Sequence, residues 1–155
     1  MECILEEHRE FLESIQIPIR LGAHTETGWP VVISLWFLYE DGRLLCATRR
    51  SARIISYLEK DDRVGFEIAE DRPPYCGVRG QARVELDGGR GKEVLERLLV
   101  KYLGGTDNRL ARSLLARADD ETAIILEPHQ VFSWNFSNRM DEVVPGLDPG
   151  DKCCP

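Results

Sequence analysis

The feature that most constrains the fold is an apolar run at residues 31–39, VVISLWFLY, which ends at an Asp41-Gly42 pair. Its length and its β-branched and aromatic side chains are typical of a strand that is buried on both faces. Asp-Gly is a common two-residue hairpin turn. Because Leu44, Leu45 and Cys46 follow the turn, the sequence predicts a hairpin around which the rest of the chain is arranged.

A cluster of polar and cationic residues follows the hairpin, just before the helical pattern of Ile54, Ile55 and Leu58. Its members are Thr48, Arg49, Arg50, Ser51 and Arg53. We interpret Ser51 as the N-cap of that helix, where free N–H groups and the cluster would form a donor-rich pocket sized for a phosphate. The alternative is a plain helix cap with solvated arginines. Because the chain has a net charge of −7, this local reversal of sign favours a phosphorylated ligand.

The remainder of the chain predicts short strands and amphipathic helices. Strands are expected at residues 17–24, 63–70, 78–86 and 122–137, the last with a kink at Pro128, and helices at residues 2–15, 54–58, 94–102 and 110–118. Gly104-Gly105 would end the third helix and Asn108 would cap the fourth. Gly80 and Ala82 would face inward on their strand, which suits either the close approach of a flat ligand or tight barrel packing.

This pattern predicts a mainly β fold with α additions, a small six-stranded antiparallel barrel with peripheral helices. No G-x-G-x-x-G, P-loop or G-x-S-x-G motif occurs, which argues against a doubly wound sheet. We expect one domain over residues 1–143. Residues 144–155 are rich in Pro, Gly and Asp and poor in apolar side chains, so we expect a disordered tail there.

Composition narrows the function classes. The excess of 27 acidic over 20 basic residues argues against nucleic acid or an anionic membrane as the main partner. No apolar run reaches spanning length and the N-terminal segment does not have the pattern of a signal peptide, so we expect a cytoplasmic protein. The five cysteines lack Cys-x-x-Cys spacing. We therefore predict no zinc site and no disulfide framework, with Cys46 and Cys76 as core thiols.

Taken in order, these motifs resemble the pyridoxamine 5′-phosphate oxidase-like family of flavin-binding split barrels. The resemblance covers roughly residues 15–137. It rests on the strand at residues 30–37, the Asp41-Gly42 turn, Thr48 followed by Ser51-x-Arg53, the DDRV sequence at residues 61–64, and the alternating strand at residues 78–84. The order of the motifs carries the resemblance, since each motif alone is short.

The resemblance implies a homodimer that binds FMN in a groove at the subunit interface. By this comparison the strand backbone at Val32, Ile33, Ser34 and Leu35 lines the flavin ring, and Trp134 on the last strand closes the groove. The phosphate would be held by Thr48, Arg49, Ser51 and Arg53. The apolar Trp36-Phe37 pair would contribute to the subunit interface.

The same resemblance leaves the activity open among three alternatives. The first is an FMN-dependent oxidoreductase acting on a small substrate, in which the flavin supplies the redox chemistry. The second is a reductase that uses a 5-deazaflavin in the same groove, and the third is a flavin-binding protein without turnover. The family's Arg-x-His feature for pyridoxal phosphate is replaced by residues 138–141, NRMD, so we do not expect pyridoxamine phosphate as the substrate. No acid–base or nucleophile set stands out, and no catalytic side chain is predicted.

Overall fold

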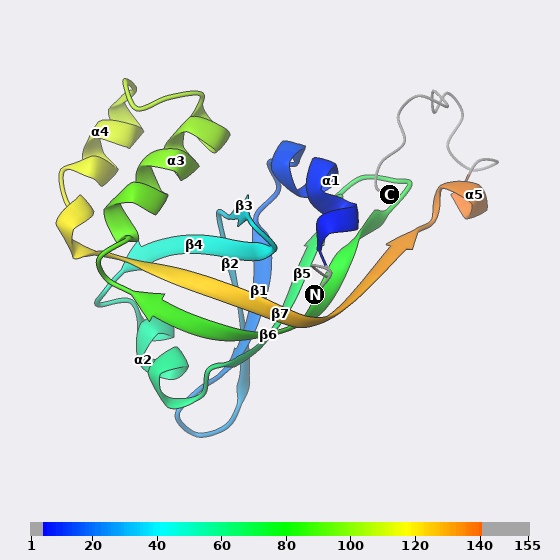
Figure 1. Ribbon diagram of the computed structural model, residues 1–155, viewed down its shortest axis with the longest axis horizontal. Coiled ribbons are helices and arrows are strands. Elements are labelled where there is room, and N and C mark those ends of the chain that lie inside the picture. The colour runs from blue at the N-terminus through cyan, green and yellow to red at the C-terminus, as the bar shows by residue number, and fades with distance from the viewer. Residues whose placement is uncertain (1–4, 141–155) are drawn as a thin grey trace.

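The computed structural model describes residues 5–140, and its central feature is one antiparallel sheet of seven strands (Figure 1). The strand order is β2-β1-β5-β6-β7-β4-β3. The strands are β1 (Ile19–His24), β2 (Pro30–Leu35), β3 (Leu38–Glu40), β4 (Arg43–Arg49), β5 (Arg63–Ala69), β6 (Cys76–Asp87) and β7 (Glu121–Asn135). The predicted mainly β antiparallel architecture is therefore confirmed, with seven strands in place of six.

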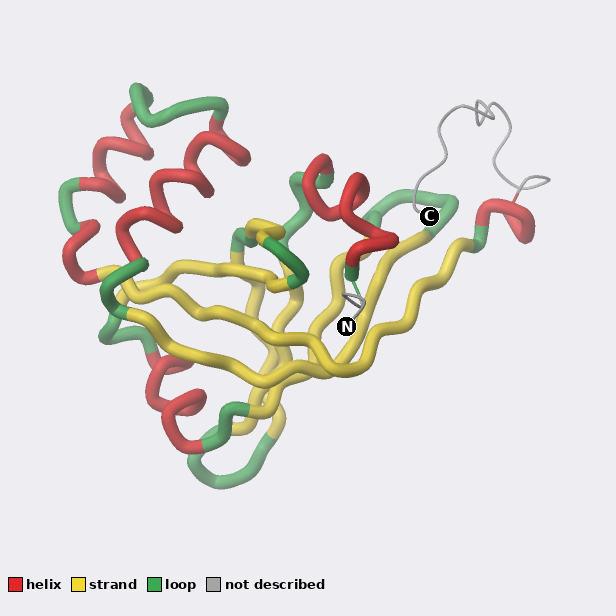
Figure 2. The backbone as a smooth tube through the Cα atoms, viewed as in Figure 1, coloured by secondary structure: helices red, strands yellow, loops and turns green. Residues whose placement is uncertain are grey.

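The helices lie around the sheet, as Figure 2 shows. They are η1 (Glu6–His8), α1 (Arg9–Ser14), α2 (Arg53–Lys60), α3 (Gly91–Leu103), α4 (Arg109–Leu115), η2 (Ala118–Asp120) and α5 (Ser137–Met140). α3 packs against β4 and β7 through Val94 and Leu98, whereas α2 buries Ile54, Ile55 and Leu58 in the barrel core. The positions that the sequence assigned to helix faces are thus the buried ones.

The apolar run at residues 31–39 is divided between two strands, so the prediction of one strand buried on both faces is wrong. β2 is an edge strand whose residues alternate between exposed and half-buried. Trp36 and Phe37 then break the strand because Phe37 turns into the core, where it is fully buried. This burial also removes Phe37 from the predicted subunit interface.

The short link between β2 and β3 shows that the sheet is strongly curled. These strands lie at opposite edges of the sheet, which would be about 29 Å apart if seven strands lay flat. The three Cα steps from Leu35 to Leu38 reach at most about 11 Å. The two edges must therefore approach each other, which makes the sheet an incompletely closed barrel.

β7 is irregular near the predicted kink. Ala82 pairs with Pro128 and Gln81 with Gln130, so His129 is the extra residue of a β-bulge. A side chain at Gly80 would collide with the Gln130 carbonyl oxygen and the Phe66 ring. Of the two explanations for a small residue at this position, tight packing is the one the structure supports.

The ends of α3 and α4 follow the predicted signals, whereas the start of α2 does not. Gly104 ends α3 with a φ of 74°, and the Asn108 side chain accepts a hydrogen bond from the Ala111 N–H (2.8 Å) at the start of α4, as predicted. The predicted cap at Ser51 is wrong, because Ala52 occupies the N-cap position of α2 and no side chain caps that helix. The helix instead begins after a turn in which the Ala52 N–H donates to the Arg49 carbonyl oxygen (2.9 Å).

Cys46 and Cys76 are buried in the core, as expected. Burial raises the pKa of Cys46 to about 12, so this thiol stays protonated near neutral pH. Among residues 5–140, no helix is long and apolar enough to cross a membrane. The tail predicted at residues 144–155 lies outside the described residues.

Candidate functional site

A pocket of about 420 Å³ lies where β2 and β4 end and β7 begins, between the sheet and the helices α3 and α4. This volume is within the range of small-molecule sites. Its lining residues are Pro18, Ser34, Leu35, Trp36, Ala47, Thr48, Arg49, Ser51, Ala52, Leu95, Leu98, Leu114 and Glu121. In Figure 1, α2 stands on one side of this end of the sheet and α3 and α4 stand on the other.

The polar end of the pocket is built by the last residues of β4 and the turn that follows. The Arg50 N–H donates to the Asp120 carbonyl oxygen (2.7 Å), which ties the turn to the start of β7. Arg49 and Ser51 line the pocket and are solvent-accessible. Because the first N–H groups of α2 have no partner within the helix, this end presents backbone donors beside a guanidinium.

The apolar end of the pocket has a fixed aromatic wall. The Trp36 ring stacks on Tyr102 of α3, with a centroid distance of 4.9 Å and an interplanar angle of 8°. The Tyr102 hydroxyl donates to the Ile17 carbonyl oxygen and accepts from the Phe37 N–H, both at 3.3 Å. Burial raises the pKa of Tyr102 to about 12. The neutral phenol therefore holds the wall in place, and a flat apolar group could lie against it.

Glu121 is the pocket residue that sequence reasoning missed. It is the first residue of β7, pairs directly with Arg49 of β4, and is only 6% exposed. Burial raises the pKa of its carboxyl group, while the charge of Arg49 opposes that shift. Nothing in the local sequence indicates a site, because an acidic residue ahead of a strand is usually solvated.

The structure brings together five of the predicted site residues, namely Ser34, Leu35, Thr48, Arg49 and Ser51. Ile33 packs against the barrel core, and Arg53 is exposed at the first position of α2. Val32 is 68% exposed and borders a different hollow. Trp134 lies near the opposite end of β7, under the Arg79 guanidinium at 5.1 Å from its ring centroid.

A second and larger hollow, of about 1080 Å³, lies on the outward face of β1, β2, β5, β6 and β7. Val32, Gly22, Gly65 and Gln81 are consecutive partners across four of these strands. Two glycines in that row leave the middle of the face without side chains, and a Cβ at either position would meet no atom closer than 3.6 Å. Within residues 5–140, the larger hollow is lined by no Trp, Tyr or Phe ring, whereas the smaller pocket has Trp36 and leucine side chains at one end and Arg49 at the other. We therefore treat the smaller pocket as the ligand site.

Metal-ligating side chains are not gathered anywhere in residues 5–140, since no group of three His, Cys, Asp or Glu residues there could hold an ion.

Comparison of the fold with solved structures gives clear matches. A conserved hypothetical protein from Mycobacterium tuberculosis aligns with a TM-score of 0.74 at 17% identity, over 94% of this chain and 91% of that chain. An F420 reductase aligns with a TM-score of 0.68 at 17% identity, over 81% and 97% of the two chains. A Clostridium acetobutylicum protein related to general stress protein 26, of the pyridoxine phosphate oxidase family, aligns with a TM-score of 0.61 at 22% identity, over 84% and 87%.

By sequence alone, no family model and no curated protein matches the chain. The class that the structure defines is the antiparallel split barrels. Within that class the chain has the fold of the pyridoxamine 5′-phosphate oxidase-like proteins, and the resemblance read from the order of its motifs is confirmed at the level of the fold.

Proposed function

We propose that the chain binds FMN in the pocket between β2, β4, β7 and α3. The observation that carries this proposal is the pocket's asymmetry. One end offers the stacked Trp36 ring and leucine side chains, and the other offers Arg49, Ser51 and the N-terminus of α2. A flavin mononucleotide has the same asymmetry, with a flat ring at one end and a phosphate at the other. Helix N-termini with nearby cations are common phosphate sites.

The proposed activity is that of an oxidoreductase. Bound flavin would supply the hydride chemistry, and the chain's own residues would bind and orient it. Arg49 and Ser51 would hold the phosphate, while Trp36, Leu95 and Leu98 would exclude water from the ring. The pocket does not require a catalytic acid or base from the protein for this role.

A 5-deazaflavin is the second candidate ligand. One of the solved structures with this fold is named an F420 reductase. Such a cofactor also joins a flat ring to a phosphate, so it would use the same two ends of the pocket.

Titration of the purified chain tests the ligand. We expect the visible absorption bands of added FMN to change and its fluorescence to be quenched on binding. Riboflavin should bind more weakly because it lacks the phosphate. Tighter binding of F420 than of FMN would select the deazaflavin alternative. If none of the three binds at micromolar concentration, the flavin proposal is wrong.

Reduction of the bound flavin tests the activity. We expect NADH or NADPH to bleach the flavin absorption slowly in anaerobic stopped-flow mixing. A flavin that stays oxidised with both nicotinamides would favour a flavin-binding protein without turnover.

We further propose a homodimer that buries the outward face of β1, β2, β5 and β6. Three properties of that face support a second copy as the occupant. It carries the exposed Val32, it lacks side chains where Gly22 and Gly65 lie side by side, and it carries both signs of charge through Arg63, Arg83 and Glu127. A self-complementary patch of this kind suits a twofold interface.

A further inference from the structure

The position of Glu121 in the pocket is fixed by the sheet. Its direct partner in β4 is Arg49, so both side chains project from the same face. The next pairs on that face, Ala47 with Ala123 and Leu45 with Ile125, pack against α3. The Glu121 side chain therefore points toward the helix side of the sheet, where the pocket lies.

The backbone at Glu121 is rigid as well. Gly91, the first residue of α3, lies so close that a Cβ there would collide with the Glu121 carbonyl oxygen. The start of α3 thus holds the first residue of β7 in place.

The Glu121 side chain is largely buried, lines the pocket and lacks a hydrogen-bond partner within residues 5–140. The residue is 6% exposed, and the structure gives its side chain no hydrogen bond and no ion pair among the described residues. Burial raises the pKa of the Glu121 carboxyl group, and Arg49 opposes that shift through its charge alone. The carboxyl oxygens are not among the fully buried atoms without a hydrogen bond, so they stay open to the pocket, where a donor group of a ligand can reach them.

We propose that Glu121 is a ligand-contacting residue that accepts a hydrogen bond from an O–H or N–H group of the bound molecule. This inference rests on the proposed flavin site. A carboxylate in the same pocket as a phosphate would repel it, so the phosphate belongs on the Arg49 side. The group facing Glu121 must then be a neutral donor, such as a hydroxyl of the ribityl chain. The pocket thereby selects ligands that carry a donor next to the phosphate.

The test compares three probes, FMN, riboflavin and inorganic phosphate, the last as a competitor of FMN. We expect Glu121→Gln to weaken FMN and riboflavin alike by about tenfold, since a charged acceptor becomes a neutral one. Competition by phosphate should stay the same or become stronger. Arg49→Ala should give the opposite pattern, with FMN and phosphate weakened and riboflavin unchanged.

Asp120→Asn is the matched control, because it removes a negative charge from the adjacent exposed residue, which does not line the pocket. We expect it to leave all three affinities unchanged. Equal flavin affinities in Glu121→Gln and wild type, with Arg49→Ala still weakening FMN, would overturn this inference and leave the flavin proposal intact. A wild-type chain that binds neither flavin would overturn both.

Thermal unfolding separates a ligand contact from a structural role. The folded-state pKa of Glu121 lies above its value of 4.5 in the unfolded chain, so its contribution to stability is fully present below that value and is lost as pH rises through the folded-state pKa. We therefore expect Glu121→Gln to raise the midpoint at pH 7 and to change it little near pH 4. A lower midpoint at pH 7 would mark Glu121 as a structural residue and overturn the proposal.

Discussion

Arg49 and Arg53 carry the same charge but occupy different places. Arg49 lines the pocket, whereas Arg53 is exposed on the first turn of α2 and is not among the lining residues. The sequence-based prediction assigns both residues to the phosphate. The structure makes Arg49 the better placed of the two to contact a phosphate.

We predict that Arg49→Ala weakens FMN binding by about ten- to a hundredfold, because a hydrogen bond to a charged group is worth about 1.5–3 kcal/mol and about 1.4 kcal/mol is tenfold in affinity. Fluorescence titration measures the change. Arg50→Ala, at an exposed neighbour that does not line the pocket, is the control and should bind FMN as wild type does. Equal losses in the two variants would mean that only the overall charge matters.

Thr48, Arg49 and Ser51, at the cationic end of the pocket, could be predicted together because they lie within four consecutive residues and follow a recognisable turn. Glu121 could not be predicted in the same way. Its burial depends on pairing with β4 and on the contact with Gly91, and both are distant in the sequence. The misplaced cap at Ser51 has a similar cause, since the Arg50 N–H bonds to Asp120, which is also distant in the sequence, and the turn runs one residue longer.

At the scale of elements, Lys101 joins α3 to α1. Its Nζ donates to the Leu12 carbonyl oxygen (2.9 Å) and lies 4.0 Å from the centroid of the Phe37 ring. The Gln16 Nε2 donates in return to the Lys101 carbonyl oxygen (2.7 Å). Burial lowers the pKa of Lys101 to about 8, and the nearby Glu13 opposes this shift. The charged amine is therefore less stable here than in the unfolded chain.

We predict that this lysine makes the stability of the fold rise with pH. The folded-state pKa of about 8 is below the unfolded value of 10.5, so the unfolded chain binds more protons between these values and unfolding becomes harder as pH increases. Urea unfolding of wild type and Lys101→Met at about pH 7.5 and about pH 10.5 measures this difference. Wild type should gain stability relative to the variant, and Lys92→Met, at an exposed position of α3, should behave as wild type. Parallel pH profiles for wild type and Lys101→Met would contradict the prediction.

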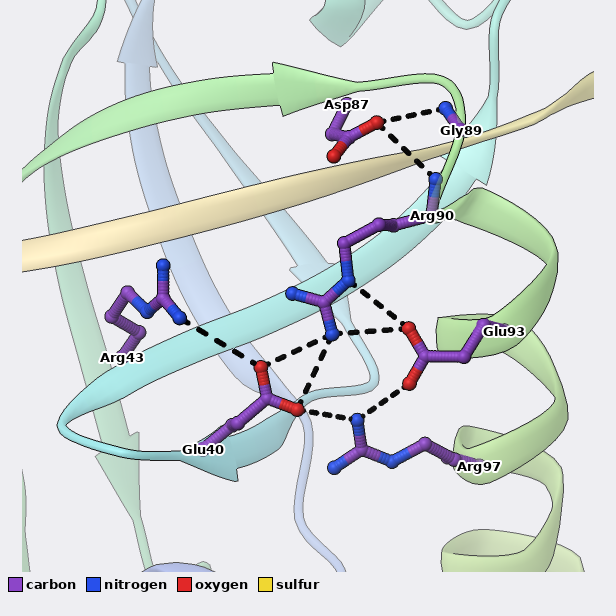
Figure 3. Close-up of polar contacts among 7 residues, drawn as sticks. All are labelled: Glu40, Arg43, Asp87, Gly89, Arg90, Glu93 and Arg97. Atoms are coloured by element: carbon purple, nitrogen blue, oxygen red, sulfur yellow. Dashed lines mark hydrogen bonds and ion pairs between the residues drawn. The ribbon is translucent and has the colours of Figure 1, made fainter.

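A second connection between elements is the charge network in Figure 3, which links the end of β3 to the first half of α3. Glu40 accepts hydrogen bonds from Arg97 (2.6 Å) and Arg90 (3.1 Å), and Glu93 accepts from the same two arginines (2.7 and 3.0 Å). The Arg97 hydrogen bond, followed by the contribution of Arg90, lowers the pKa of Glu40. The carboxylate is therefore stabilised in the fold.

We predict that Glu40→Gln destabilises the fold by about 1 kcal/mol at neutral pH, at the upper end for a partly exposed ion pair, because one carboxylate binds two guanidinium groups. The stabilisation by Glu40 is present above its unfolded pKa of 4.5 and is lost as pH falls. The deficit of the variant should thus vanish in acid. Urea unfolding measures it, with Glu96→Gln as an exposed control on α3. An undiminished deficit at low pH would show that packing, rather than charge, is responsible.

Element types were largely predictable because β1, β5, β6 and α3 keep a clear hydrophobic period. The division of the apolar run at residues 31–39 between two strands was not predictable. An edge strand followed by a core phenylalanine has the same composition as one buried strand. Only the pairing of β3 with β4, and of β2 with β1, distinguishes the two arrangements.

At the scale of the whole molecule, we predict that Val32→Glu converts a dimer into a monomer. Val32 is 68% exposed at the proposed interface, where a buried unpaired carboxylate would be costly. Val100→Glu is the matched control, since Val100 is 57% exposed on α3 and does not border that hollow. Sedimentation velocity at micromolar concentration measures both. A wild-type monomer, or a dimer that persists in Val32→Glu, would refute the proposed interface.

The two-residue link between β2 and β3 also limits how a ligand can enter. This link is a covalent restraint, because at most about 11 Å of chain connects the two edge strands of the sheet. The edge strands β2 and β3 therefore cannot separate to admit a bulky molecule between them. Trp36 belongs to this link and also lines the pocket, so we expect a ligand to enter from the other end of the pocket, where β4 ends and α2 begins.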